Sequence, residues 1–145
     1  MRFAIFPLGG AEGAILVHSM RVGGRLFKKG RVLAKPDLEA LAASGVASVT
    51  AVRLEPGDIP EDVAATRVAE ALAGEGTRLS AAFTGRTNLY AEQSGIAMID
   101  PKGVDAVNLI DEAVTVATLA PYAVVAPGEM LATIKIIPYA APEWA

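Results

Sequence analysis

Basic residues that could hold an anion are concentrated in one segment near the start of the chain. Residues 21–35 contain six of the 13 lysines and arginines, and no acidic residue occurs between Glu12 and Asp37. The chain as a whole has a net charge of -3, so this segment is locally opposite in sign. Its glycines mark a hairpin, and its charges favour an anion or a negatively charged neighbour. A solvated charged face without a ligand is the alternative.

A second group of polar residues lies in the segment FTGRTNLYAEQSG at 83–95, which we expect to form a turn between apolar elements. In one interpretation, Arg86 pairs with a buried acid and Asn88 closes a turn through its own backbone. In the other, the segment lines a polar pocket, where Arg86 offers a two-pronged donor for phosphate or carboxylate. Thr84, Thr87 and Asn88 would complete the ring of polar groups.

Lys135 interrupts the otherwise apolar strand MLATIKII. Its ammonium must therefore reach solvent, a partner carboxylate or an anionic ligand. The solvent-facing side of a half-buried strand is the most common place for such a lysine.

Several kinds of chemistry are disfavoured by composition. His18 is the only histidine and cysteine is absent, which excludes a histidine cluster or thiolates as a metal site. We assign neither a catalytic nor a metal-binding residue. Nucleic-acid binding is not expected, because Phe27 is the only aromatic residue within 21–35 and the chain is acidic overall. No apolar run approaches the roughly 20 residues of a membrane helix. We therefore expect no membrane partner and a cytoplasmic location.

Glycine and proline divide the chain into short strands and about three helices. The expected helices run from Pro36 to a stop at Gly45, from Pro60 to Gly74, and from Asp100-Pro101 to about Ile110. The expected strands span residues 2–6, 13–17, 25–33, 47–54, 78–83, 96–99, 114–119 and 130–137. This pattern predicts an α+β fold: a single compact domain of mixed short strands over residues 1–138. A subdivision is conceivable near 74–77, and the Ala/Pro-rich residues 139–145 are typical of a linker to a missing downstream domain.

Three segments together resemble a known family. The glycine-marked hairpin and the two helices that follow it within 13–74, FTGRTNLYAEQSGI at 83–96 and TIKIIPYA at 133–140 resemble the N-terminal region of bacterial molybdopterin-binding proteins. Those proteins are similar to the molybdenum-insertion enzymes of molybdenum cofactor biosynthesis. The resemblance implies a molybdopterin-binding domain in the same chain, beginning just after TIKIIPYA. It also implies that the parent protein is a cofactor-biosynthesis transferase, while this portion is not catalytic on its own.

The resemblance also suggests which residues contact the cofactor, molybdopterin. Arg86, Asn88 and Lys135 are the first candidates, for contact with the pterin phosphate or with the following domain. Lys28, Lys29 and Arg31 form a second tier. Two functions therefore remain open. In the first, the chain is a module that assists in binding the anionic pterin. In the second, it is a non-catalytic scaffold or dimerisation module, in which the same charges contact another domain or a second copy in a homo-oligomer.

Overall fold

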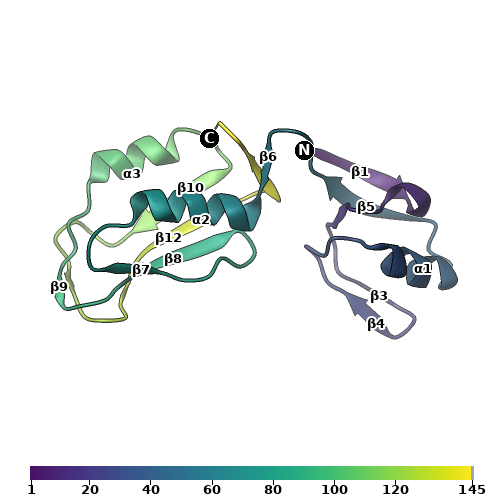
Figure 1. The fold of residues 1–145 in the computed structure, drawn as a ribbon, viewed down its shortest axis with the longest axis horizontal. Helices are drawn as coiled ribbons and strands as arrows, with labels where there is room; N and C mark the ends of the chain where they lie inside the picture. Colours follow the sequence, from purple (N-terminus) through teal and green to yellow (C-terminus); the bar gives the residue numbers. More distant parts are fainter. Residues whose placement is uncertain (145) are drawn as a thin grey trace. The chain divides into compact units, whose positions relative to one another are not determined.

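The computed structural model describes residues 1–144, which form two compact units joined after Asp58 (Figure 1). The predicted α+β class is confirmed, with helices and many short strands in several small sheets. The chain divides at residues 58 and 59, whereas the sequence suggested a subdivision near 74–77. Residues 74–77 instead connect α2 (Glu61–Leu72) to β7 (Thr77–Leu79) within the second unit. That helix packs on the sheet that follows it, so the two cannot belong to separate units.

The first unit, Met1–Asp58, is a small antiparallel sheet with one helix and one hairpin. Its sheet has the order β1-β5-β2, formed by β1 (Arg2–Pro7), β5 (Ser48–Arg53) and β2 (Ile15–Leu16). The 3-10 turn η1 (Leu8–Gly10) follows β1, and β3 (Met20–Val22) pairs with β4 (Arg25–Phe27) across Gly23-Gly24. The helix α1 (Lys35–Ala43) starts next to Pro36 and ends before Gly45, as predicted. The core includes Phe6, Leu16, Phe27, Leu33, Leu41 and Val49.

The strand expected over 25–33 ends earlier, at Phe27. Lys28, Lys29 and Gly30 form a turn, and Gly30 has a φ of 80° that suits glycine. The chain then runs back along β2, where the Leu16 N–H donates to the Arg31 carbonyl at 2.9 Å. The basic segment is therefore a bent loop rather than one continuous strand.

The second unit is an antiparallel four-stranded sheet with two helices on one face. The sheet has the order β10-β12-β8-β7, formed by β10 (Val114–Thr118), β12 (Met130–Ile136), β8 (Arg86–Ala91) and β7. Two smaller pairs join β9 (Gly95–Ile96) to β11 (Val124–Val125), and β6 (Asp58–Pro60) to β13 (Ala140–Pro142). The helix α2 contacts β8 and β12, and α3 (Pro101–Asn108) contacts β10 (Figure 1). Asp100 caps α3 by accepting from the Lys102 N–H at 3.0 Å.

The segment 86–91 is a strand and not the turn that its polar residues suggested. Thr87, Leu89 and Ala91 are buried, while the residues between them are more exposed. This alternation is that of a strand with one face against the core. The polar character of Arg86, Thr87 and Asn88 concealed it.

The tail also differs from the sequence-based expectation. Residues 139–145 were expected to begin a linker, but Ala140 and Ala141 are almost fully buried in β13. Ala141 packs in the core cluster formed by α2 and the sheet. Within residues 1–144, no helix is long and apolar enough to span a membrane.

Candidate anion-binding face

Arg86 and Lys135 lie directly opposite each other on neighbouring strands. The antiparallel register of β8 and β12 pairs these two residues, and Thr115 of β10 lies opposite Lys135 on its other side. Directly opposite residues have Cβ atoms about 5 Å apart and point to the same face of a sheet. The fold therefore brings two of the three first-tier candidates together as a cross-strand pair, which we call the basic pair.

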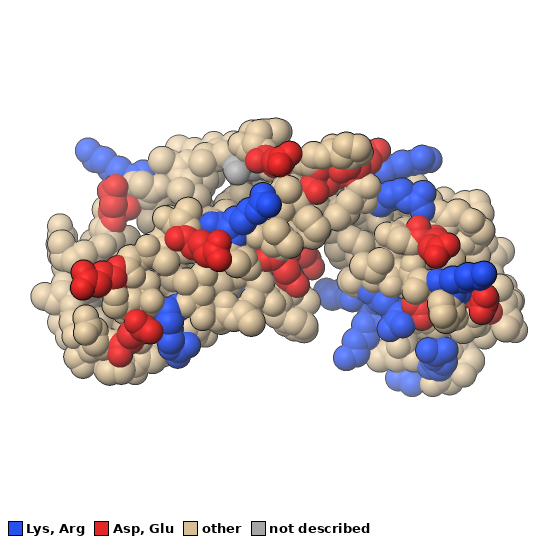
Figure 2. Space-filling model, viewed as in Figure 1, with Lys and Arg blue, Asp and Glu red and all other residues tan. Residues whose placement is uncertain are grey.

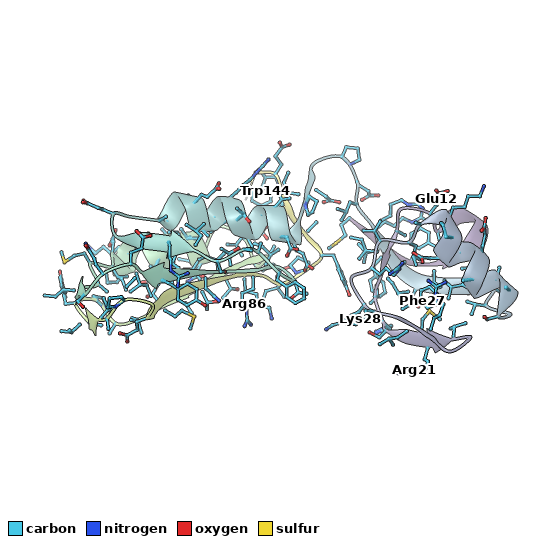
Figure 3. The ribbon with its side chains drawn as sticks, turned by 60° about the horizontal axis from the view of Figure 1, so that its bottom comes forward. Glu12, Arg21, Phe27, Lys28, Arg86 and Trp144 are labelled. Carbon is cyan, nitrogen blue, oxygen red and sulfur yellow. The ribbon has the colours of Figure 1, made fainter. Side chains whose placement is uncertain are left out.

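The basic pair lies on the side of the sheet away from α2 and α3. Thr87 and Ile134, which alternate with the pair along β8 and β12, are fully buried. Since successive side chains of a strand alternate between faces, Arg86 and Lys135 point to the other side, where both are exposed. Figure 3 labels Arg86 at its place in this sheet. We call this side the open face; its polar residues are Arg78, Arg86, Asn88, Tyr90, Thr115, Thr133 and Lys135.

No carboxylate of the described residues forms an ion pair with either member of the basic pair. The interpretation in which Arg86 pairs with a buried acid is therefore wrong. Asp62 accepts from the Gly85 N–H in the preceding turn, and Glu61 lies beside the same glycine. Like charges directly opposite each other destabilise a sheet. An anion bound between them would remove that repulsion.

Asn88 and Thr133 form the next cross-strand pair along the open face. Asn88 lies within β8, and its side-chain amide donates to the Tyr90 hydroxyl at 3.2 Å, so the interpretation in which it closes a turn through its own backbone is wrong. Asn88 Oδ1 and Thr133 Oγ1 are buried and have no hydrogen-bond partner in the described part of the chain. Buried polar atoms are usually paired, because an unpaired one loses its hydration without replacement. The two atoms are an acceptor and a hydroxyl donor next to the basic pair, and a ligand would reach them only after the side chains rotate.

The turn before Arg86 is held in an unusual conformation. Phe83 and Arg86 exchange backbone hydrogen bonds, and the two residues between them, Thr84 and Gly85, have φ values of 49° and 71°. Two positive φ values in a two-residue hairpin loop define a type I′ turn. The Gly85 N–H donates to Asp62 Oδ1 at 2.7 Å. Threonine rarely adopts a positive φ, so Thr84 is strained and the tertiary contacts of the turn must hold it.

Arg31, from the second tier, has a carboxylate partner in the first unit. Its Nε and Nη2 donate to the two oxygens of Asp37, each at 2.8 Å. Asp37 is 3% exposed and also accepts from the Ala34 N–H at the start of α1. The Arg31 hydrogen bonds, more than any other cause, hold the pKa of Asp37 below its usual value, and they raise the pKa of Arg31. Arg31 therefore joins the basic loop to the N-terminus of α1.

Lys28 and Lys29 are exposed at the turn that precedes Gly30. The backbone N–H of Lys29 donates to Ser19 Oγ at 2.9 Å and so stabilises the turn. Neither lysine ammonium forms an ion pair among the described residues. Figure 2 shows basic side chains gathered on the visible face of this unit. Their role in anion binding stays a prediction. The structure places them in a different unit from the basic pair.

Two threonines of the open face were not identified from sequence. Thr133 lies two residues before Lys135 on one strand, so the strand period alone could have placed it on the same face. Thr115 could not be found in this way, because its place beside Lys135 depends on the pairing of β10 with β12. In the part of the chain that the structure describes, no group of three or more metal-ligating side chains is gathered.

The fold and its open face define a mixed α+β protein with an uncompensated basic pair. A family model described as Domain of unknown function (DUF8806) matches residues 6–53, which lie within the first unit. The match spans about a third of the chain and excludes both members of the basic pair. No curated protein matches the chain, and no solved structure matches it.

Proposed function

We propose that this chain is the N-terminal module of a molybdopterin-binding protein of molybdenum cofactor biosynthesis. Its open face would assist binding by contacting the phosphate of the anionic pterin. Two features support the proposal: the resemblance of TGRTNLYAE and TIKIIPYA to that family, and the meeting of these two segments as paired strands.

The observation that carries the proposal is the uncompensated basic pair. Arg86 and Lys135 face each other without a carboxylate partner among residues 1–144, an arrangement that lowers the stability of the sheet unless an anion offsets it. Arginine binds a phosphate through two parallel N–H groups, and lysine adds a compact positive charge. A phosphate bound between the two side chains would accept from both.

The neighbouring polar atoms fit part of the cofactor. Once the two side chains rotate toward the open face, the hydroxyl of Thr133 can donate to a phosphate oxygen, and Oδ1 of Asn88 can accept from an N–H of a pterin ring. The open face lies on a sheet, so it would contact one side of the molecule. A downstream domain of the same chain would enclose the rest. We assign no catalytic step to the residues of this chain.

Calorimetric titration of the 145-residue chain with molybdopterin tests the proposal, with inorganic phosphate and ADP as control ligands. We expect saturable binding of the pterin, weakened about tenfold or more by Arg86→Ala or by Lys135→Ala. Arg67→Ala is the matched control, because Arg67 is an exposed arginine of α2 that forms no ion pair within residues 1–144. Absence of binding by the folded protein, or equal affinity in all three variants, would contradict the proposal.

The second candidate function is a scaffold or dimerisation module, and exposed apolar residues beside the basic pair favour it. Phe83 is 76% exposed next to the turn, and Ile137, two residues after Lys135, is 58% exposed. Aromatic and arginine side chains with apolar neighbours are common at the centres of protein interfaces. Sedimentation analysis of the wild type and of Phe83→Ser would distinguish the two functions. A dimer dissociated by Phe83→Ser supports the scaffold, whereas a monomer that binds molybdopterin supports the ligand module.

A further inference from the structure

A cavity of about 680 Å³ lies in the second unit, on the helix side of the sheet. Its floor is formed by inward-facing residues of three strands, including Leu89, Val116 and Ala132. The end of α2 and the first turns of α3 form its walls, and the loop that carries β9 closes one end. The cavity and the open face are therefore on opposite sides of the same sheet.

Small residues line the cavity both on its floor and at its exposed rim. Ala71 on α2, Gly103 on α3 and Ala132 on the floor all line it. Two separate core clusters border it: one contains Leu89, Val116 and Ala132, and the other contains Ala91, Ala97 and Val125. Protein interiors are close-packed, and an apolar space of this size lies within the range of small-molecule sites. The space between the two clusters is therefore large enough for a small molecule, which could enter beside the exposed Ile96 and Met98.

The charge of the lining restricts which ligand the cavity could take. Of the residues that the structure describes, two carboxylates line it, Glu75 and Asp100, and no lysine or arginine does. Hydroxyl and amide groups of Thr77, Gln93 and Ser94 supply the polar contacts. An anion would lose its hydration and meet two negative charges, which is unfavourable. Neutral or cationic molecules carry no such cost.

We propose that this cavity binds a neutral or cationic small molecule with a largely apolar ring system. The apolar part would lie on Leu89, Val116 and Ala132, with its hydrogen-bond donors toward Glu75 and Gln93. The site is separate from the basic pair and has the opposite charge preference. It does not depend on whether the open face binds a pterin.

Two fluorescent probes with one ring skeleton test the charge preference. N-phenyl-1-naphthylamine is neutral, and 1-anilinonaphthalene-8-sulfonate is the same skeleton with a sulfonate. Titrations of the 145-residue chain should show one site for the neutral probe, with a blue-shifted emission. Binding of the sulfonate at that site should be about tenfold weaker or more. Glu75→Gln should reduce this difference.

Cavity-filling variants show where the probe binds. Ala132→Leu should abolish most binding of the neutral probe, because the added side chain extends from the floor. Ala71→Phe fills the same space from α2 and serves if the first variant does not fold. Ala117→Leu is the matched control, since Ala117 is exposed and pairs with Thr133 of the open face. Only the probe fluorescence that is lost in the cavity-filling variants, and kept in the control, is assigned to binding in the cavity. Absence of such a signal, an equal loss in the control, or equal affinity for both probes would overturn the proposal.

Discussion

The basic loop of the first unit and the basic pair of the second present the same residue types in different surroundings. Arg31 uses its guanidinium to hold the buried carboxylate of Asp37, whereas Arg86 faces Lys135 and has no ion pair among the described residues. An arginine already bound through two N–H groups to a carboxylate has little capacity left for a ligand. The comparison therefore separates an arginine that stabilises the fold from one that is available to an anion, although both were candidates by sequence.

The charges of the two units differ in a way that sharpens this contrast. The first unit has eight basic and five acidic residues, a net charge of +3, and the second has five and eleven, a net charge of −6. From net charge alone, an anion-binding site would therefore be expected in the basic loop of the first unit and not at the basic pair of the second. The local geometry, and not the net charge of the unit, makes Arg86 the better candidate for an anion-binding residue.

The largest effect is expected from changing the turn that positions Arg86. Gly85→Ala should destabilise the second unit by about 3 kcal/mol, because φ is positive and a Cβ would lie 2.7 Å from the Ile136 carbonyl oxygen. Gly128→Ala is the control, since Gly128 also has a positive φ but a Cβ there would have no atom within 4 Å. Its cost should be about 1 kcal/mol. Urea unfolding measures both, and equal costs would contradict the proposed backbone clash.

Asp37→Ala should give the next largest effect, in the first unit. The change removes the partner of Arg31 and the acceptor for the Ala34 N–H at the start of α1. Loss of such a helix-capping carboxylate costs about 2 kcal/mol. Glu39→Ala, at an exposed acidic residue of the same helix, should change the free energy of unfolding by less than about 0.5 kcal/mol. If the two variants unfold alike, Arg31 is not held as described.

Much of this contrast could not be read from the sequence, for identifiable reasons. Proline and glycine located the helices well: Pro36 and Gly45 bound α1, and Gly45 forms the expected left-handed end. The bond between Arg31 and Asp37 depends on the turn at Gly30, which the sequence pattern merged into one strand. Local periodicity does not contain that information.

The basic pair was equally hidden, because strand pairing is a long-range property. Lys135 was correctly expected on the exposed side of a strand. The candidacy of Arg86 as a binding residue stays a prediction. The two residues lie opposite each other because β8 pairs with β12. The polar residues of β8 made this strand hard to recognise in the sequence, and no local pattern predicts the strand order β10-β12-β8-β7. The buried tail strand β13 was missed because Ala140 and Ala141 occur as often in linkers as in a close-packed core.

Acid should weaken the first arginine site selectively. The folded-state pKa of Asp37 lies below its unfolded value, mainly because Arg31 donates to the carboxylate. This stabilisation is complete above the unfolded pKa of about 4 and is lost as the pH falls through the lower folded value. The difference in unfolding free energy between wild type and Asp37→Asn should therefore shrink below about pH 4. A difference that is constant from pH 6 to pH 2 would contradict the assigned pair.

The smallest effect is expected at Thr84. Thr84→Gly should relieve the positive φ, but the added freedom of the unfolded chain offsets the gain, so the net stabilisation should be about 0.5 kcal/mol. Thermal unfolding measures the free energy of unfolding of this variant and of a control, Thr66→Gly. Thr66 lies in the interior of α2, so the control should lose about 1 kcal/mol of stability. Destabilisation by Thr84→Gly would show that the threonine side chain makes a contact that outweighs its strain.

The central claim is tested most directly by measuring stability and ligand binding together in Arg31→Ala and Arg86→Ala. We expect Arg31→Ala to lower the unfolding temperature while leaving molybdopterin affinity unchanged. Arg86→Ala should weaken that affinity and raise the unfolding temperature slightly, because it removes the repulsion between Arg86 and Lys135. If Arg31→Ala reduces the affinity, or Arg86→Ala reduces the stability and not the affinity, the distinction between a structural arginine and a ligand-binding arginine is wrong.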